Sequence, residues 1–168
     1  MAKKMFGNIR FLKGDLSPKD RLVLIAATVF GVGYTPLCPG TASCLVALPV
    51  FLFIKNPVYF AVFTLASLII SFLVCGRAEK LFGQKDSKLI VIDDFSGMLI
   101  TYLFIPHDFR YLVCGFFLFR MLDMLKIPPA DTLERCPGAK GVVGDDLVAG
   151  VYANLILHSV RLILAIFS

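Results

Sequence analysis

Long apolar runs alternate with short polar or Gly/Pro-rich segments along the whole 168-residue chain. This pattern predicts an all-helical protein in which the polar segments connect the helices. The apolar stretches that we expect to be helical are 22–30, 41–54, 58–75, 89–105, 111–125 and 145–167. The connecting segments are expected at 31–41, 55–57, 76–88, 106–108 and 126–144.

Two of the apolar stretches indicate a membrane protein. Asn56 to Gly76 carries no charge over 21 residues, and a helix of about 20 apolar residues crosses a bilayer. Leu22 to Ile54 is uncharged over 33 residues, but its glycines and prolines prevent one continuous helix. Hydrophobic residues make up 58% of the chain, against about 45–50% in an ordinary soluble domain, and mean hydropathy is +0.82.

These features predict a small polytopic helical membrane protein with about four principal transmembrane helices. An N-terminal amphipathic helix and a Gly/Pro-rich loop would precede those helices. The length suits one domain, 1–168, in which a basic arm, 1–21, precedes a helical core, 22–168. The alternative is a soluble all-α domain with unusually apolar helices.

The basic residues are distributed asymmetrically and therefore predict a topology. Fourteen of the 17 Lys and Arg residues lie in 1–21, 76–88 and 120–145, whereas Lys55, Arg110 and Arg161 belong to the opposite turns or ends. Because Lys and Arg favour cytoplasmic loops, the amino terminus and the basic loops are expected in the cytoplasm. Nucleic acid is excluded as a partner, because the aromatic residues sit in apolar runs and are not interleaved with the basic ones. The charge fits contact with membrane lipids.

The five cysteines do not indicate a metal site or a disulfide framework. Their number is odd and their spacings match no zinc pattern. The N-terminal segment lacks the features of a cleaved signal peptide, so we expect no cleavage. A homo-oligomer is compatible with the sequence, which does not determine the oligomeric state.

The predicted topology brings four separate polar clusters to the cytoplasmic face. These clusters are Pro39-Gly40-Thr41, Asp93-Asp94, the segment from Arg120 to Lys126, and Asp145-Asp146. Ionisable residues at membrane depth are candidates for function by default. The cytoplasmic face is therefore where we expect the active site.

The paired acids are the strongest candidates for metal binding. Adjacent carboxylates such as Asp93 and Asp94 repel each other unless a cation lies between them, and Mg²⁺ prefers oxygen ligands. The alternative for this pair is a helix N-terminus, where the helix dipole favours acids. Asp145 and Asp146 are expected to open a helix, so one of them can cap it while the other coordinates a ligand.

Basic residues beside these acids are candidates for phosphate binding. Arg120, Asp123 and Lys126 are spaced by three and fall on one side of a helix. The two cations can pair with Asp123 or neutralise a phosphate. Gly40 and Thr41 lie at an expected helix start, where backbone N–H groups can bind an anion.

Four segments in this order resemble the phosphatidylglycerophosphatase A family: GVGYTPLCPGTAS, VIDDFSGML, FRMLDMLK and GVVGDDLVAGVYA. The resemblance covers about residues 31–153. It implies a Mg²⁺-dependent, all-helical enzyme of the bacterial inner membrane that converts phosphatidylglycerophosphate, a phospholipid, to phosphatidylglycerol and phosphate.

The resemblance also implies roles for individual residues. The catalytic acids would be Asp93, Asp94, Asp123, Asp145 and Asp146, and all of these except Asp123 would be metal ligands. The phosphate-binding residues would be Gly40, Thr41, Arg120 and Lys126. Several positions depart from the family pattern: Asp94 replaces a Glu, Ser43 and Cys44 replace a Gly and a Ser, and the run Lys126-Ile127-Pro128-Pro129 lacks the usual Trp.

Two other functions were weighed against this one. A small membrane transporter or ion-conducting protein would place acids near the membrane midplane and polar residues toward both faces, whereas the clusters here favour one face. A CDP-alcohol phosphotransferase also uses Asp and Mg²⁺ at a membrane, but its DGxxAR pattern is absent from the sequence.

Overall fold

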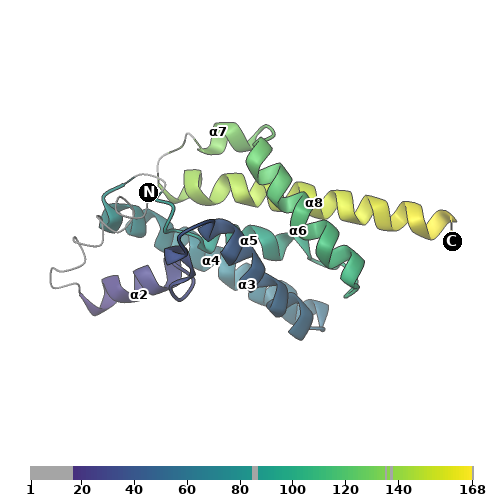
Figure 1. The fold of residues 1–168 in the computed structure, drawn as a ribbon, viewed down its shortest axis with the longest axis horizontal. Helices are drawn as coiled ribbons and strands as arrows, with labels where there is room; N and C mark the ends of the chain where they lie inside the picture. Colours follow the sequence, from purple (N-terminus) through teal and green to yellow (C-terminus); the bar gives the residue numbers. More distant parts are fainter. Residues whose placement is uncertain (1–16, 85–86, 135, 137, 168) are drawn as a thin grey trace.

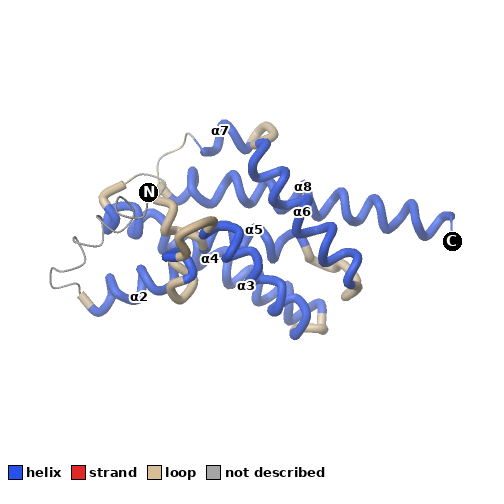
Figure 2. The backbone as a smooth tube through the Cα atoms, in the orientation of Figure 1, coloured by secondary structure: helices blue, strands red, loops and turns tan. Residues whose placement is uncertain are grey.

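The computed structural model describes residues 17–84, 87–134, 136 and 138–167, and this part of the chain contains helices and no strand (Figures 1 and 2). The all-helical prediction is therefore confirmed for the described residues. The elements are α2 (Pro18–Ala27), a 3₁₀ turn (Val32–Tyr34), α3 (Pro39–Phe53), α4 (Pro57–Phe82), α5 (Ile92–Thr101), α6 (Phe109–Leu125), α7 (Ala130–Glu134) and α8 (Ala139–Phe167). Most of the basic arm, residues 1–16, lies outside the described residues.

Local sequence signals explain where several helices begin. Proline occupies the first turn of α2, α3 and α4, where its missing N–H costs nothing and its fixed φ suits the helix. The Asn56 side chain accepts hydrogen bonds from the N–H groups of Val58 and Tyr59 at the start of α4. The Asp108 side chain accepts one from the Arg110 N–H at the start of α6.

The short helix α5 lies at the centre of the bundle and packs against α3, α4 and α8 (Figure 1). All of its residues except Asp94 are buried. Glycine permits the close crossing with α8: a Cβ on Gly97 would lie 2.8 Å from the Asp146 carbonyl oxygen, and one on Gly150 would meet the Gly97 carbonyl. This crossing places the acid-bearing first turn of α5 against α8.

Buried hydroxyl groups connect α4 to α5. The Ser96 hydroxyl lies 2.9 Å from that of Ser67 and 2.7 Å from that of Ser71. Ser71 also lies within hydrogen-bonding distance of the Ile92 carbonyl, at 3.2 Å. From the other side, the Ser43 hydroxyl of α3 donates to the Val91 carbonyl at 2.6 Å. These bonds hold the start of α5 between α3 and α4.

Several expected segment boundaries are wrong. Helix α2 spans Pro18–Ala27 instead of 22–30, and α5 spans Ile92–Thr101 instead of 89–105. Residues 76–82 continue α4 instead of forming a loop, because Ala78 and Phe82 bury one side of the helix while Arg77 and Lys80 face outward. Residues 139–144 belong to α8 instead of a loop. Gly144 packs closely there, since a Cβ on it would lie 3.2 Å from the Leu133 side chain.

Among the described residues, α4 and α8 are long and apolar enough to cross a membrane. Most of their apolar side chains are exposed, including Val62 and Leu73 of α4 and Leu164 of α8, unlike those of the core helices of a soluble protein. These helices indicate a membrane protein. The expected number of about four spans is not confirmed, because α3, α5 and α6 have 15, 10 and 17 residues.

Candidate active site

The polar ends of α3, α5, α6 and α8 meet around one cavity of about 580 Å³, which we call the acid cavity. Four segments that are far apart in the sequence therefore converge at one end of the bundle. The residues that line the cavity are Leu37, Cys38, Pro39, Gly40, Thr41, Ser87, Lys88, Ile90, Asp93, Asp94, Phe116, Phe117, Arg120, Asp123, Met124, Lys126, Val142, Asp145 and Asp146.

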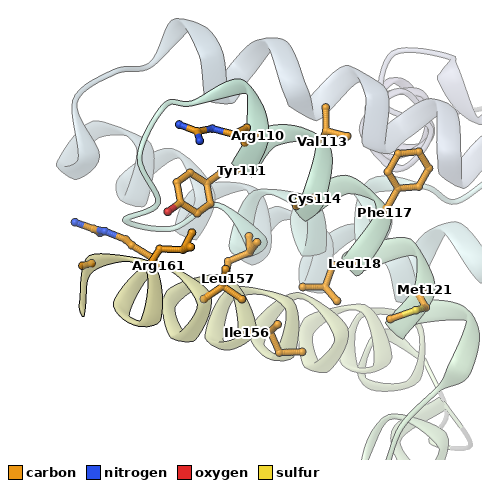
Figure 3. Close-up of a pocket in the computed structure, with 13 residues that line it drawn as sticks. Arg110, Tyr111, Val113, Cys114, Phe117, Leu118, Met121, Ile156, Leu157 and Arg161 are labelled. Atoms are coloured by element: carbon orange, nitrogen blue, oxygen red, sulfur yellow. The ribbon is translucent and has the colours of Figure 1, made fainter. Parts of the chain in front are cut away.

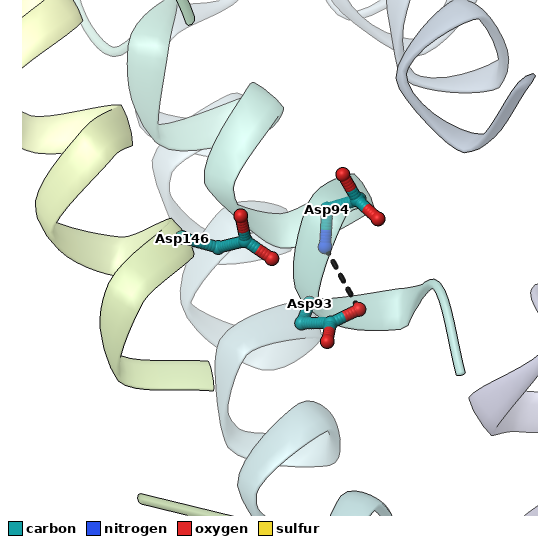
Figure 4. Close-up of side chains that lie close together, drawn as sticks. All are labelled: Asp93, Asp94 and Asp146. Atoms are coloured by element: carbon teal, nitrogen blue, oxygen red, sulfur yellow. Dashed lines mark hydrogen bonds between the residues drawn. The ribbon is translucent and has the colours of Figure 1, made fainter. Parts of the chain in front are cut away.

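Three carboxylates that line the acid cavity lie close together (Figure 4). One oxygen each from Asp93, Asp94 and Asp146 lies within 4.8 Å of the others. Asp93 and Asp146 are buried, and Asp94 is partly buried. The Asp94 N–H donates to Asp93 Oδ1 at 3.0 Å and orients that side chain. A group of three clustered oxygen donors can hold a metal ion.

The electrostatics of the α5 acids favour a nearby cation. Burial, reinforced by the Asp94 charge, raises the pKa of Asp93 well above its usual range. Burial also raises the pKa of Asp94 to about 7, although the Arg120 guanidinium opposes this shift. Removing carboxylates from water disfavours their charged form, and a cation bound between them reverses that penalty.

Arg120 connects the acid cluster to α6. Its guanidinium forms an ion pair with Asp94 of α5 and a second one with Asp123, one turn along α6, at 3.0 Å. The Arg120 side chain is 21% exposed. Arg120 is thus paired with both acids and still lines the acid cavity.

Lys126 holds the remaining acid. Its ammonium group lies 3.2 Å from Asp145 Oδ2. Helix α6 ends at Leu125, and Lys126 follows with φ of 47°, which turns the chain beside the acid cavity. The other oxygen of Asp145, Oδ1, is buried without a hydrogen-bond partner. A donor or cation at this oxygen would be stabilising, because an unsatisfied buried acceptor is costly.

The first turn of α3 forms the opposite wall of the acid cavity. Gly40 and Thr41 both line it, and the first N–H groups of a helix have no partner within the helix. A Cβ at Gly40 would overlap the carboxylate of Asp94, so a larger residue at this position would displace that carboxylate. The absence of a side chain therefore lets α3 approach the acid cluster.

All nine sequence-predicted site residues line the acid cavity, but they do not form one cluster. Asp145 pairs with Lys126 instead of joining the three clustered carboxylates. The prediction that Asp145-Asp146 opens a helix and that one of the two caps it is wrong, because α8 begins at Ala139 and both acids lie within it. The alternative for Asp93-Asp94 is compatible with the structure, since both acids lie in the first turn of α5.

The sequence interpretation missed several residues of the acid cavity. Ser87 and Lys88 line it and directly precede the apolar run that carries Asp93, which is the signal that was available. Phe116, Phe117 and Met124 supply an apolar side of the cavity. They sit in an apolar stretch in which no pattern distinguishes cavity-lining positions from others.

Comparisons with known proteins agree on one family. The family model described as Phosphatidylglycerophosphatase A matches residues 25–161. A protein of Escherichia coli K12 named phosphatidylglycerophosphatase A is 36% identical over 139 residues, covering 80% of this chain and 80% of that protein. A Haemophilus influenzae protein of the same name is 27% identical, over 82% of this chain and 87% of its own length.

A third relative carries a different name. A Bacteroides thetaiotaomicron protein, provisionally named as a phosphatidylinositol-3-phosphatase, is 31% identical over 83% of this chain and 94% of its own length. No solved structure matches the chain significantly.

Proposed function

Because the chain belongs to the phosphatidylglycerophosphatase A family, it is a phosphatidylglycerophosphate phosphatase, and we propose that the acid cavity is where the terminal phosphate is removed. The observation that carries this proposal is one cavity in which three clustered carboxylates lie beside two cations, Arg120 and Lys126. Phosphoryl transfer needs positioning and charge stabilisation more than covalent chemistry from the protein, and this cavity is suited to both.

Mg²⁺ is the cofactor that this donor set fits best. The clustered oxygens of Asp93, Asp94 and Asp146 would hold it, and the unpartnered Oδ1 of Asp145 is a further buried oxygen donor in the same cavity. Mg²⁺ is typically bound by one or two carboxylates together with substrate phosphates. When bound, such an ion polarises phosphoryl oxygens and lowers the pKa of water.

The cations and the start of α3 would bind the phosphate. Arg120 offers a planar fork of N–H donors and Lys126 a point charge. Both already form ion pairs with acids of the cavity. A substrate phosphate would therefore share with these acids two cations that are already positioned. The N–H groups of Gly40 and Thr41 would donate to it at a helix N-terminus. Asp123 would orient Arg120 through their 3.0 Å ion pair.

The enzyme would act at the cytoplasmic face of a bacterial inner membrane as a multi-pass protein. The support is the positive-inside asymmetry of the sequence together with the convergence of the polar helix ends at one cavity. This one-sided arrangement also favours an enzyme over a transporter or ion-conducting protein. Carbonate washing should leave the protein in the membrane fraction, and a reporter fused to the amino terminus should be cytoplasmic. Release by carbonate would refute membrane integration.

Phosphate release from different substrates tests the activity. The relatives' names give two lipids, phosphatidylglycerophosphate and phosphatidylinositol 3-phosphate, and both are phosphomonoesters. We expect phosphate release from phosphatidylglycerophosphate to exceed release from phosphatidylinositol 3-phosphate and from soluble phosphomonoesters. A higher kcat/KM for phosphatidylinositol 3-phosphate would make that lipid the preferred substrate. Turnover of soluble phosphomonoesters alone would refute the proposal that the protein is a lipid phosphatase.

A further inference from the structure

A second cavity, of about 1020 Å³, lies between α6 and α8, and we call it the α6/α8 groove. Its lining is mostly apolar and includes Leu118 of α6 with Ile156 and Leu157 of α8. Figure 3 shows Arg110 and Arg161 toward one end of the groove and Phe117 and Met121 toward the other. None of the acids of the acid cavity lines this groove.

The α6/α8 groove adjoins the acid cavity through α6. Phe117 lines both cavities. Its neighbour Phe116 lines the acid cavity only, and its other neighbour, Leu118, lines the groove only. One turn further along α6, Met121 belongs to the groove and Met124 to the acid cavity. The α6/α8 groove therefore begins where the acid cavity, the proposed phosphate site, ends.

Apolar side chains of the groove are exposed in the described part of the chain. Phe117 is 66% exposed, Met121 51% and Leu164 56%. An apolar surface of this extent is characteristic of a binding site or a lipid contact.

We propose that the α6/α8 groove binds the acyl chains of the lipid whose phosphate is hydrolysed in the acid cavity, an inference that rests on the proposed function. A lipid whose phosphate lies beside Arg120 must direct its chains into the membrane, and Phe117 marks a contiguous apolar path. Arg120 and Arg110 are ten residues apart on α6, which is about 15 Å along a helix. The groove thus extends along this helix for a substantial part of an acyl chain.

The arginines at the far end do not favour a different occupant, a second anionic lipid bound by its headgroup. Arg110 forms an ion pair with Asp108 at 3.1 Å, and Arg161 donates to the Phe104 carbonyl at 3.4 Å. Because Arg120 and Lys126 also have partners from this chain, this pairing alone does not decide the occupant of the groove. Phe117, in contrast, lines both cavities. It therefore connects the groove to the acid cavity, where the substrate phosphate would react.

Narrowing the groove tests the proposal. Cys114→Trp on α6 and Ile156→Trp on α8 each place a bulky ring in the groove at an exposed lining position. Ile70→Trp is the matched control, because Ile70 is 43% exposed and Ile156 41%, and Ile70 lies on α4, outside both cavities. Phosphate release is measured in detergent with dipalmitoyl and dihexanoyl phosphatidylglycerophosphate.

We expect both groove variants to lose about tenfold or more in kcat/KM for the dipalmitoyl substrate and to keep wild-type kcat/KM for the dihexanoyl substrate. The control should match wild type on both, and retained dihexanoyl turnover shows that a variant is folded. Equal losses on both substrates, as expected if the groove holds a structural lipid or a second copy of the chain, would overturn the inference. Unchanged dipalmitoyl turnover would also overturn it. Wild-type protein that hydrolyses neither lipid would instead refute the proposed function.

Discussion

Arg120 on α6 forms an ion pair with Asp94 on α5, one of the three clustered carboxylates of the acid cavity. A residue proposed to bind the substrate phosphate thus also positions a proposed metal ligand. Because the two side chains belong to different helices, the pair also fixes α6 against α5. Arg120 should therefore affect both stability and catalysis.

Replacing Arg120 with Ala should lower the free energy of unfolding and kcat/KM together. The change leaves the carboxylate of Asp94, 17% exposed, without its cation, and the cost of such a loss is about 1–3 kcal/mol. We expect kcat/KM to fall about tenfold or more. The control for stability is Arg110→Ala, whose 87% exposed side chain pairs with Asp108 and should contribute little, because solvent screens exposed ion pairs. Lower stability with wild-type kcat/KM would reduce Arg120 to a structural role.

Lys126→Ala should impair catalysis and also lower stability. The Lys126 side chain is 34% exposed but that of Asp145 only 13%, so the change leaves a mostly buried carboxylate without its cation, at a cost of about 1–3 kcal/mol. If Lys126 binds phosphate, kcat/KM should fall about tenfold or more. Lys140→Ala is the control, because Lys140 is an exposed residue of α8 outside the acid cavity. A Lys126→Ala variant that melts early yet keeps wild-type kcat/KM would refute the phosphate role.

Gly40→Ala should lower activity by displacing the carboxylate of Asp94. The added Cβ would overlap that carboxylate, which Arg120 holds in place. We expect a lower kcat and a higher Mg²⁺ concentration for half-maximal activity. Gly76→Ala is the control, because its Cβ would lie 3.5 Å from the nearest atom, at ordinary contact distance. Equal Mg²⁺ titration curves for both variants would contradict this steric account of Gly40.

Ser71→Ala should destabilise the protein by about 1 kcal/mol. The substitution removes a buried hydroxyl that lies within hydrogen-bonding distance of Ser96 and of the Ile92 carbonyl. Ser159→Ala is the matched control, since the exposed Ser159 hydroxyl donates only to the carbonyl four residues earlier. Denaturation in detergent compares the two variants. Equal midpoints would show that the hydroxyl cluster between α4 and α5 contributes no measurable stability.

The sequence was sufficient to predict helix starts that depend on local chemistry. Pro18 and Pro57 lie in the first turns of α2 and α4, and Asn56 and Asp108 cap α4 and α6, through rules that involve only neighbouring residues. It was insufficient at Gly141 and Gly144, which read as loop residues but lie buried in α8. There, close packing outweighs the low helix propensity of glycine.

The candidate site was predictable to a similar extent. Charged residues in an apolar chain are conspicuous, so Asp93, Asp146 and Arg120 could be selected from sequence alone. Their partners could not, because the pairing of Lys126 with Asp145 and of Arg120 with Asp94 depends on how α6, α8 and α5 cross. Lys88, which also lines the acid cavity, was missed although it directly precedes the apolar run that carries Asp93.

The central claim is that the clustered carboxylates hold the Mg²⁺ required for hydrolysis. The most direct test of this claim is a Mg²⁺ titration of phosphate release from phosphatidylglycerophosphate. It compares the wild-type protein, Asp146→Asn and the control Asp131→Asn, and melting curves establish that each variant is folded. Wild type and the control should be inactive in EDTA and recover with Mg²⁺, whereas folded Asp146→Asn should show no measurable turnover. Full wild-type activity in EDTA, or a folded Asp146→Asn variant with wild-type turnover, would contradict the account.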